Sequence, residues 1–154
     1  MLDRQVVHTR WKKRYEFELG SYVFSRGREE EGFTVNLAPR QVVKYADRNV
    51  DWPDFGCPRD TKEIEDILFE IAKRVKSNKP VYFGCYGGMG RTGTLAALLL
   101  KVLGSKNPIR DIRMMYSDHA VETAKQEQYV TEFDVRPVRI RLFWWKVRNF
   151  FRLS

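Results

Sequence analysis

The chain has 154 residues, of which 43% are hydrophobic, and it carries a formal net charge of +8. This size suits one globular domain with a hydrophobic core and is too small for two. Two cysteines, Cys57 and Cys85, cannot form a disulfide framework, and no apolar run resembles a signal peptide or a membrane-spanning helix. The composition therefore predicts a cytoplasmic protein.

The first part of the chain is predicted to form strands. Residues 14–26 alternate apolar and polar side chains around Gly20 and Ser21, which indicates a β-hairpin within residues 10–26. Two further strands are predicted at Phe33–Leu37 and Val42–Ala46.

A helix is predicted from Thr61 to Lys76, because apolar residues recur there at helical spacing behind a capping pair, Asp60 and Glu63. Val81–Phe83 suits a buried strand, and Thr92–Leu103 suits an apolar helix. Further helices are predicted after Asn107 and at Thr123–Phe133. Helices that follow an interior strand indicate an α/β fold, with a central mixed sheet flanked by helices.

A glycine-rich loop joins the predicted buried strand to the next helix, and residues 84–94 read GCYGGMGRTGT. The glycines allow successive backbone N–H groups to point inward, and the helix adds the positive end of its dipole. A nucleotide-binding P-loop would end in Gly-Lys-Ser/Thr, whereas this loop begins with a thiol and ends with a guanidinium. We therefore predict a phosphate-binding loop made of Cys85, Tyr86, Gly87, Gly88, Met89, Gly90 and Arg91.

Cys85 is the predicted nucleophile, because the loop N–H groups, the helix end and Arg91 all favour a thiolate over a thiol. Arg91 offers a planar fork that fits two phosphate oxygens. Thr92 can donate its hydroxyl to the sulfur and help it to leave. The alternative is that Cys85 is a small buried residue and that the glycines only form a turn.

A general acid is predicted in the segment Asp51-Trp52-Pro53-Asp54-Phe55-Gly56. Pro53 stiffens the segment, Trp52 can anchor it and Gly56 can act as a hinge, so that Asp54 reaches the phosphate. Ordinary turn chemistry is the alternative for an aspartate between proline and glycine.

These two segments resemble the acid loop and the Cys-x5-Arg-Ser/Thr loop of the protein tyrosine phosphatases, and the chain's small size resembles their dual-specificity branch. Residues 121–126 are similar to the family's glutamine loop, in which Gln126 would position the hydrolytic water. A Thr123–Gln126 capping box is a compatible alternative role. The resemblance covers about residues 33–133. It implies a phosphatase-like fold, a phosphorylated protein substrate and a phosphocysteine intermediate, with no cofactor.

Several residues depart from the family pattern. Gly84 stands where the family usually has histidine, and Glu122 stands where tyrosine-specific members often have a second glutamine. Tyr86 and Met89 are uncharged, whereas phosphoinositide-directed relatives often carry lysines there, which disfavours a phosphoinositide substrate.

No metal is expected, since His8 and His119 have no partner at metal-ligand spacing. Cys57 is either a packed small residue or a partner that traps oxidised Cys85 as a disulfide. Two functions of another class stay open: a phosphate-binding module without catalysis, and a scaffold bound to a membrane or another polyanion.

Residues 136–154 contain six basic side chains and no acidic one, so a basic aromatic tail follows a predicted catalytic domain at residues 1–135. A helix from Ile140 onward would separate aromatic and basic side chains, which suits binding of residues 138–154 to an anionic membrane surface. Alternatively, the tail packs on the core as a helix or a strand. No nucleic-acid partner is expected.

Overall fold

The computed structural model describes residues 5–9, 13–21, 32–38 and 46–153. Five strands in these ranges form one sheet with the order β1-β2-β5-β3-β4. Only β1 and β2 are antiparallel, and the other three neighbouring pairs are parallel. The predicted mixed sheet is therefore confirmed, and four strands end at the same edge of it. The strands are β1 (Gln5–His8), β2 (Glu16–Ser21), β3 (Phe33–Asn36), β4 (Arg48–Asn49) and β5 (Val81–Cys85).

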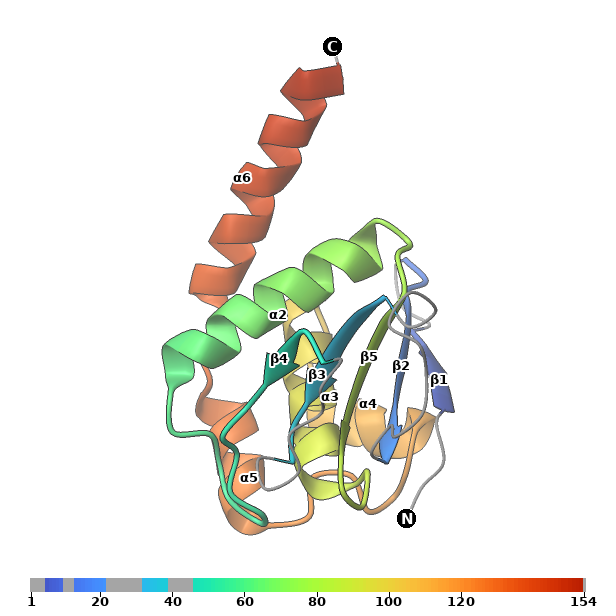
Figure 1. Cartoon of the computed structure of the whole chain (residues 1–154), viewed down its shortest axis with the longest axis vertical. Coiled ribbons are helices and arrows are strands. Elements are labelled where there is room, and N and C mark those ends of the chain that lie inside the picture. Colours follow the sequence, from blue (N-terminus) through green and yellow to red (C-terminus); the bar gives the residue numbers. More distant parts are fainter. Residues whose placement is uncertain (1–4, 10–12, 22–31, 39–45, 154) are drawn as a thin grey trace.

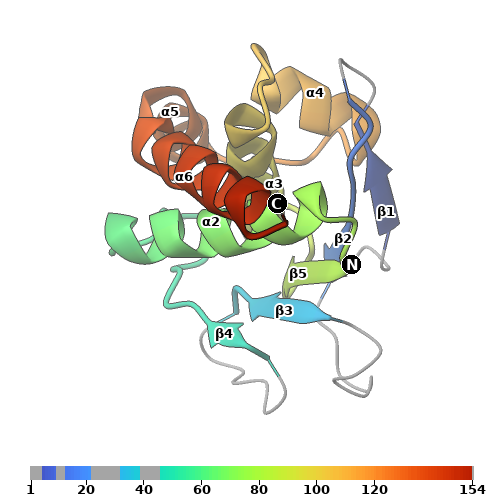
Figure 2. The same cartoon turned by 90° about the horizontal axis from the view of Figure 1, so that it is seen from above.

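The described helices gather on one face of the sheet (Figures 1 and 2). The central one, α3, packs against β2, β5, α2, α4 and α5, and nearly all of its residues are buried. This arrangement confirms the α/β class. It also holds the first residue of α3 close to the last residue of β5, because both elements are packed in the core. The helices are α2 (Thr61–Lys76), α3 (Gly90–Val102), α4 (Pro108–Met115), α5 (Ala124–Glu132) and α6 (Arg136–Leu153).

Helix α2 covers the residues predicted for it. The Asp60 carboxylate accepts a hydrogen bond from the Glu63 N–H at 3.2 Å, so the predicted N-cap is formed. The apolar positions all turn toward the core, as the 3.6-residue period requires. They are Ile64, Ile67, Leu68, Ile71, Ala72 and Val75.

The predicted turn at Gly20 and Ser21 is wrong, because both residues lie inside β2 and pair with Gly84 and Cys85 of β5. A Cβ atom added to Gly84 would lie 2.8 Å from the Gly20 carbonyl oxygen. Glycine therefore permits close approach of two backbones here and does not mark a turn. Strand β2 does form a hairpin, but with β1 as the preceding strand. Residues 22–26, and all but the end of the predicted strand Val42–Ala46, lie outside the described residues.

The tail forms the helix α6, so its helical alternative is confirmed and the strand alternative is wrong. The first half of α6 packs on α2, where Val138 and Leu142 are buried and Arg141 pairs with Asp66 at 2.5 Å. The second half extends beyond α2 (Figure 1). Within the described ranges, no helix has both the length and the apolar character needed to cross a membrane.

Candidate active site

The candidate site lies at the edge of the sheet where β5 ends. Cys85 is the last residue of β5 and Gly90 is the first of α3, so the intervening loop is held at both ends by buried elements. Ser21 of β2 lies beside Cys85 and Asn36 of β3 lies beside Gly84. Ends of parallel strands are where α/β sheets commonly place ligands.

Two donors point at the sulfur of Cys85. The Gly88 N–H lies 3.2 Å from Sγ, and the Thr92 hydroxyl lies 2.9 Å from it. The Cys85 N–H donates to Thr92 Oγ1 at 2.8 Å, so the single hydroxyl proton is shared between the sulfur and the more distant Gly20 O at 3.4 Å. Both hydrogen bonds end on this buried sulfur.

The loop's sharp path depends on Gly88, whose φ is +76°. A Cβ atom at this position would also lie 2.7 Å from the backbone of Gly20 and Ser21. The buried Tyr116 hydroxyl donates to the Gly88 carbonyl oxygen. Burial raises the pKa of Tyr116, with smaller contributions from Cys85 and Tyr82, so the phenol stays a donor.

Gly84, the departure from the family's histidine, has a packing explanation. A Cβ atom there would meet the Tyr82 hydroxyl at 3.1 Å as well as the Gly20 carbonyl. Tyr82 donates to the Ser21 carbonyl oxygen and thus closes the same space from the side. A side chain at position 84 would require β2 and β5 to move apart.

Arg91 is almost fully buried, and carbonyl groups hold one end of its guanidinium. Nη1 donates to Leu37 O at 3.1 Å and to Trp52 O at 3.3 Å, while Nη2 lies 3.5 Å from Asp54 Oδ1. Nε is buried and has no hydrogen-bond partner among the described residues. An unpaired buried donor costs about 1–3 kcal/mol. An oxyanion that contacted Nε and Nη2 together would satisfy it.

The start of α3 also favours an anion, and the Glu122 carboxylate is close to it, since a Cβ atom at Gly90 would lie 2.8 Å from Glu122 Oε2. The N-cap residue of α3, Met89, makes no side-chain capping hydrogen bond, and the first turn has no acidic residue. The first N–H groups of a helix need acceptors from outside the helix, and they carry the positive end of the dipole. Thiol, guanidinium and helix end therefore converge on one space with the chemistry of a phosphate site.

Asp54 reaches this space from the acid loop, residues 51–56. Its carboxylate is largely exposed and pairs with Arg91. Trp52 is fully buried, and its Nε1 donates to Gly56 O at 2.8 Å, so the anchoring predicted for Trp52 is formed. Phe55, the next residue after Asp54, has a φ of +59°, an uncommon conformation for a residue with a Cβ atom.

Gln126 ties the acid loop to α5. Its Oε1 accepts from the N–H groups of Glu122 and Thr123 at 3.0 and 3.3 Å, and its Nε2 donates to Gly56 O at 3.1 Å. The Thr123 hydroxyl accepts from Gln126 N and donates to Phe55 O at 3.1 Å. The predicted capping box is confirmed, and it doubles as a clamp on the acid loop.

The Cys57 thiol lies against α5, where it donates to Lys125 O at 3.4 Å. Burial raises the pKa of this thiol, and the nearby Lys125 ammonium offsets part of the rise. His8 lies 3.4 Å from Glu16 in the first hairpin. In the ranges that the structure describes, no group of three or more His, Cys, Asp or Glu residues could hold a metal ion.

Three contacts of the site were missed from the sequence. The Leu37 and Trp52 carbonyls that hold Arg91 are backbone groups, so they cannot be predicted from the residue types. Tyr116 follows α4 at a position without a motif. The spacing of Thr123 and Gln126 predicted the capping box itself, but not its hydrogen bonds to the acid loop.

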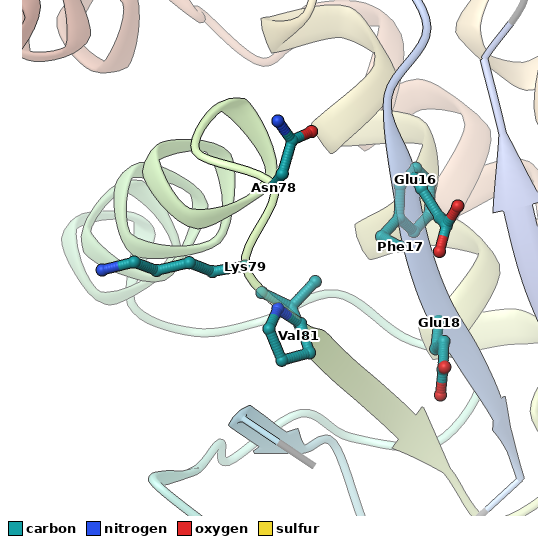
Figure 3. A pocket seen from close by; sticks show the side chains of 7 residues that line it. Glu16, Phe17, Glu18, Asn78, Lys79 and Val81 are labelled. Carbon is teal, nitrogen blue, oxygen red and sulfur yellow. The ribbon is translucent and has the colours of Figure 1, made fainter. Parts of the chain in front are cut away.

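A separate cavity of about 220 Å³ lies at the other end of the sheet (Figure 3). It opens where β5 begins, four residues before Cys85, and near the start of β2. At about 3.3 Å per strand residue, the cavity is more than 10 Å from the sulfur. It is lined by Glu16, Phe17, Glu18, Asn78, Lys79, Pro80 and Val81.

The sequence family described as "PTP-SAK: Swiss Army Knife protein, DSP-PTPase phosphatase domain" matches residues 49–136, which are more than half of the chain. The chain belongs to this phosphatase family. The match includes the acid loop, the cysteine loop and Gln126, and it confirms the predicted resemblance to the protein tyrosine phosphatase superfamily.

Similar proteins include other members of this phosphatase group. An uncharacterized protein of Methanocaldococcus jannaschii is 42% identical over 98 residues, which are 60% of each chain. The present chain thus spans about 60% of that relative's length. Crystalline Tk-PTP in its active form is 25% identical, with a TM-score of 0.57 over 71% of this chain and 82% of its own. Kinase associated phosphatase shares the fold, with a TM-score of 0.66 at 18% identity over 84% and 93% of the two chains.

Proposed function

We propose that this DSP-PTPase domain is a cysteine-dependent phosphomonoester hydrolase that removes phosphate from tyrosine, or from both tyrosine and serine/threonine, in phosphorylated proteins. One observation carries the proposal: the buried, unpaired Nε of Arg91 belongs to the same loop as a sulfur that receives two hydrogen bonds. A bound phosphate dianion would give that Nε an acceptor and would lie in front of the sulfur.

In the first step, the Cys85 thiolate attacks phosphorus and forms the S–P bond while the P–O bond to the substrate breaks. Asp54 donates its proton to the departing oxygen, which leaves as a neutral hydroxyl group. Arg91 and the N–H groups of the loop stabilise negative charge on the three equatorial oxygens. The product of this step is phosphocysteine with an ionised Asp54.

In the second step, Asp54 takes a proton from a water molecule, which attacks phosphorus and breaks the S–P bond. The sulfur leaves as a thiolate, and the Thr92 hydroxyl at 2.9 Å stabilises the charge that it acquires. Gln126 holds the acid loop in place and is proposed to orient the water through the amide hydrogen that Gly56 does not use.

Two exposed aromatic side chains border the reacting groups along the chain. Phe55 follows Asp54, and Tyr86 follows Cys85. Aromatic rings at the entrance of a pocket favour a flat aryl ester over a short aliphatic one. This chemistry supports phosphotyrosine as the better substrate within the proposed class.

The test is turnover of nitrophenyl phosphate and of a phosphotyrosine peptide by Cys85→Ser. Because a serine hydroxyl stays protonated, turnover should fall below about one per cent while inorganic phosphate still binds. Cys57→Ser is the matched control, and its activity should stay near that of the natural chain. Substantial turnover by Cys85→Ser would rule out a phosphocysteine intermediate.

A further inference from the structure

Helix α6 exposes a row of large apolar side chains. Each of the five is between 53% and 70% exposed, although aromatic and branched side chains of this size are usually buried in a soluble domain. We call these residues the apolar stripe; they are Ile140, Phe143, Trp144, Phe150 and Phe151.

The apolar stripe points away from the core, and Phe143 at its edge also lines a pocket beside Lys76 and Val102. Val138 and Leu142 are buried against the core, and Trp145 packs partly against it. At about 100° per residue, the five stripe residues fall within roughly 60° of the direction opposite to Val138. The half-buried Val147 lies on the same outward line. Packing of the first half of α6 on α2 therefore fixes the outward direction of the stripe.

Basic side chains border the apolar stripe on both sides. By the same helical geometry, Arg139 and Lys146 lie along one edge, and Arg148 and Arg152 lie along the other. None of these four forms an ion pair with a residue that the structure describes. Residues 135–154 contain no acidic side chain. Arg141, by contrast, is used internally, since it pairs with Asp66 and lies over the Phe69 ring.

We propose that α6 binds an anionic lipid surface and holds the phosphatase domain there. An apolar stripe between two basic edges matches a membrane interface, in which rings enter the acyl boundary and cations meet acidic headgroups. A second copy of the chain fits less well, because stripe-to-stripe contact would bring basic edges together without acidic partners. A nucleic acid would neutralise the cations but leave the stripe in water.

The proposed orientation leaves the phosphatase site accessible. Strand β5 runs toward the end of the molecule opposite the carboxyl terminus of α6 (Figure 1), so Cys85 lies at the far end from the outer half of the helix. A lipid surface under the outer half of α6 would therefore not cover the site. Membrane binding and hydrolysis of a soluble ester are expected to be independent.

The experiment is cosedimentation of the whole chain with two kinds of vesicle, pure phosphatidylcholine and a mixture with phosphatidylserine, at low and high salt. We expect binding to the anionic vesicles alone, weakened by salt. Two variants test the two chemistries: Phe150→Ser with Phe151→Ser, and Lys146→Glu with Arg148→Glu. Each pair should weaken binding about tenfold or more. All four side chains are exposed on the surface, so the circular dichroism spectrum of each variant should be unchanged.

A control makes comparable exchanges on α4, one basic and one large apolar residue, with Arg110→Glu and Met114→Ser, both exposed. It should leave vesicle binding intact, and every variant should hydrolyse nitrophenyl phosphate at the natural rate. The proposal is overturned by absent binding, by equal binding to neutral vesicles, or by equal losses in the control. Two other results without vesicle binding would also overturn it. One is a dimer in sedimentation velocity that the stripe substitutions abolish, and the other is binding of DNA. Cys85→Ser should bind vesicles normally, which separates this proposal from the catalytic one.

Discussion

The guanidinium of Arg91 and the carboxylate of Asp54 contact each other, with Nη2 3.5 Å from Oδ1. The two residues have opposite tasks in the proposed mechanism, since one attracts the phosphate and the other protonates the departing oxygen. A phosphate that contacts Nη2 must displace the carboxylate from its partner, because both are anions. In the proposed mechanism, substrate binding thus transfers Arg91 from Asp54 to the phosphate, and the released Asp54 takes up a proton from solvent before it serves as the acid.

Asp54→Asn should separate the two tasks. An amide cannot supply a proton, so hydrolysis of phosphotyrosine should fall about 10²-fold, while nitrophenyl phosphate, with its better leaving group, should lose much less. Removal of the competing anion should also tighten inhibition by inorganic phosphate by about two- to tenfold. Steady-state kinetics with both esters and phosphate inhibition measure these effects. Equal losses on both substrates would remove Asp54 from the role of acid.

Arg91→Lys should be severe although it keeps the positive charge. An ammonium cannot contact two phosphate oxygens in a plane while also holding the Leu37 and Trp52 carbonyls. We expect kcat/KM to fall about 10²-fold or more. Because Arg91 is buried, thermal unfolding must be measured beside the kinetics, and Arg110→Lys on the surface is the matched control. Near-natural kcat/KM in Arg91→Lys would show that a point charge is enough.

Lys101 has a structural task that can be tested without touching the site. Its Nζ donates to three carbonyls at the end of α5, those of Val130, Thr131 and Phe133, at 2.9, 3.0 and 2.8 Å. Burial lowers the pKa of Lys101, and Asp134 offsets part of that effect. Lys101→Met should leave these carbonyls without a donor and lower the free energy of unfolding by about 1–3 kcal/mol.

Urea unfolding checks this expectation, with the exposed Lys106→Met as control. Activity on nitrophenyl phosphate should persist in both variants below their unfolding transitions. No change in the unfolding free energy of Lys101→Met would show that water replaces the ammonium at the helix end.

Periodicity and capping were enough to predict α2, α3, α4 and α5 from the sequence, whereas the residues of α6 were left open between a helix and a strand. Helix α2 was predicted at its observed residues because six apolar positions and an N-cap agree there, and the strand before Cys85 was recognised from its apolar run. The prediction at Gly20 was wrong because a glycine within a strand pattern indicates a turn unless the residue beside it in the fold is known. That neighbour, Gly84, is 64 positions away, and the pairing of β2 with β5 leaves no local pattern.

The site shows the same division between local and distant information. Cys85, Gly88 and Thr92 lie within eight residues of one another, and their hydrogen bonds follow from the loop sequence. The carbonyls that orient Arg91 come from a strand end and from the acid loop, and they depend on the folded backbone. The spacing of residues in the sequence can therefore predict which side chains form the proposed phosphate site. It cannot predict which contacts hold each side chain in position.

Gln126 has two possible contributions, and they can be separated by the step that each affects. Its link to Gly56 positions the acid loop, which serves both steps, whereas orientation of water serves only the second. Gln126→Ala removes both contributions. Trp52→Phe removes the Nε1 contact to the same carbonyl and part of the buried ring volume, but it leaves Gln126 in place.

We expect Gln126→Ala to release nitrophenol in a burst of about one equivalent per enzyme, followed by a slow steady rate, because phosphocysteine accumulates when its hydrolysis is slowed. Trp52→Phe should show a lower rate without a burst, since a displaced acid loop slows both steps. Stopped-flow measurement of nitrophenol release distinguishes the two patterns. Slow turnover without a burst in both variants would assign Gln126 to loop positioning alone, and the hydrolytic water would then be held by another group.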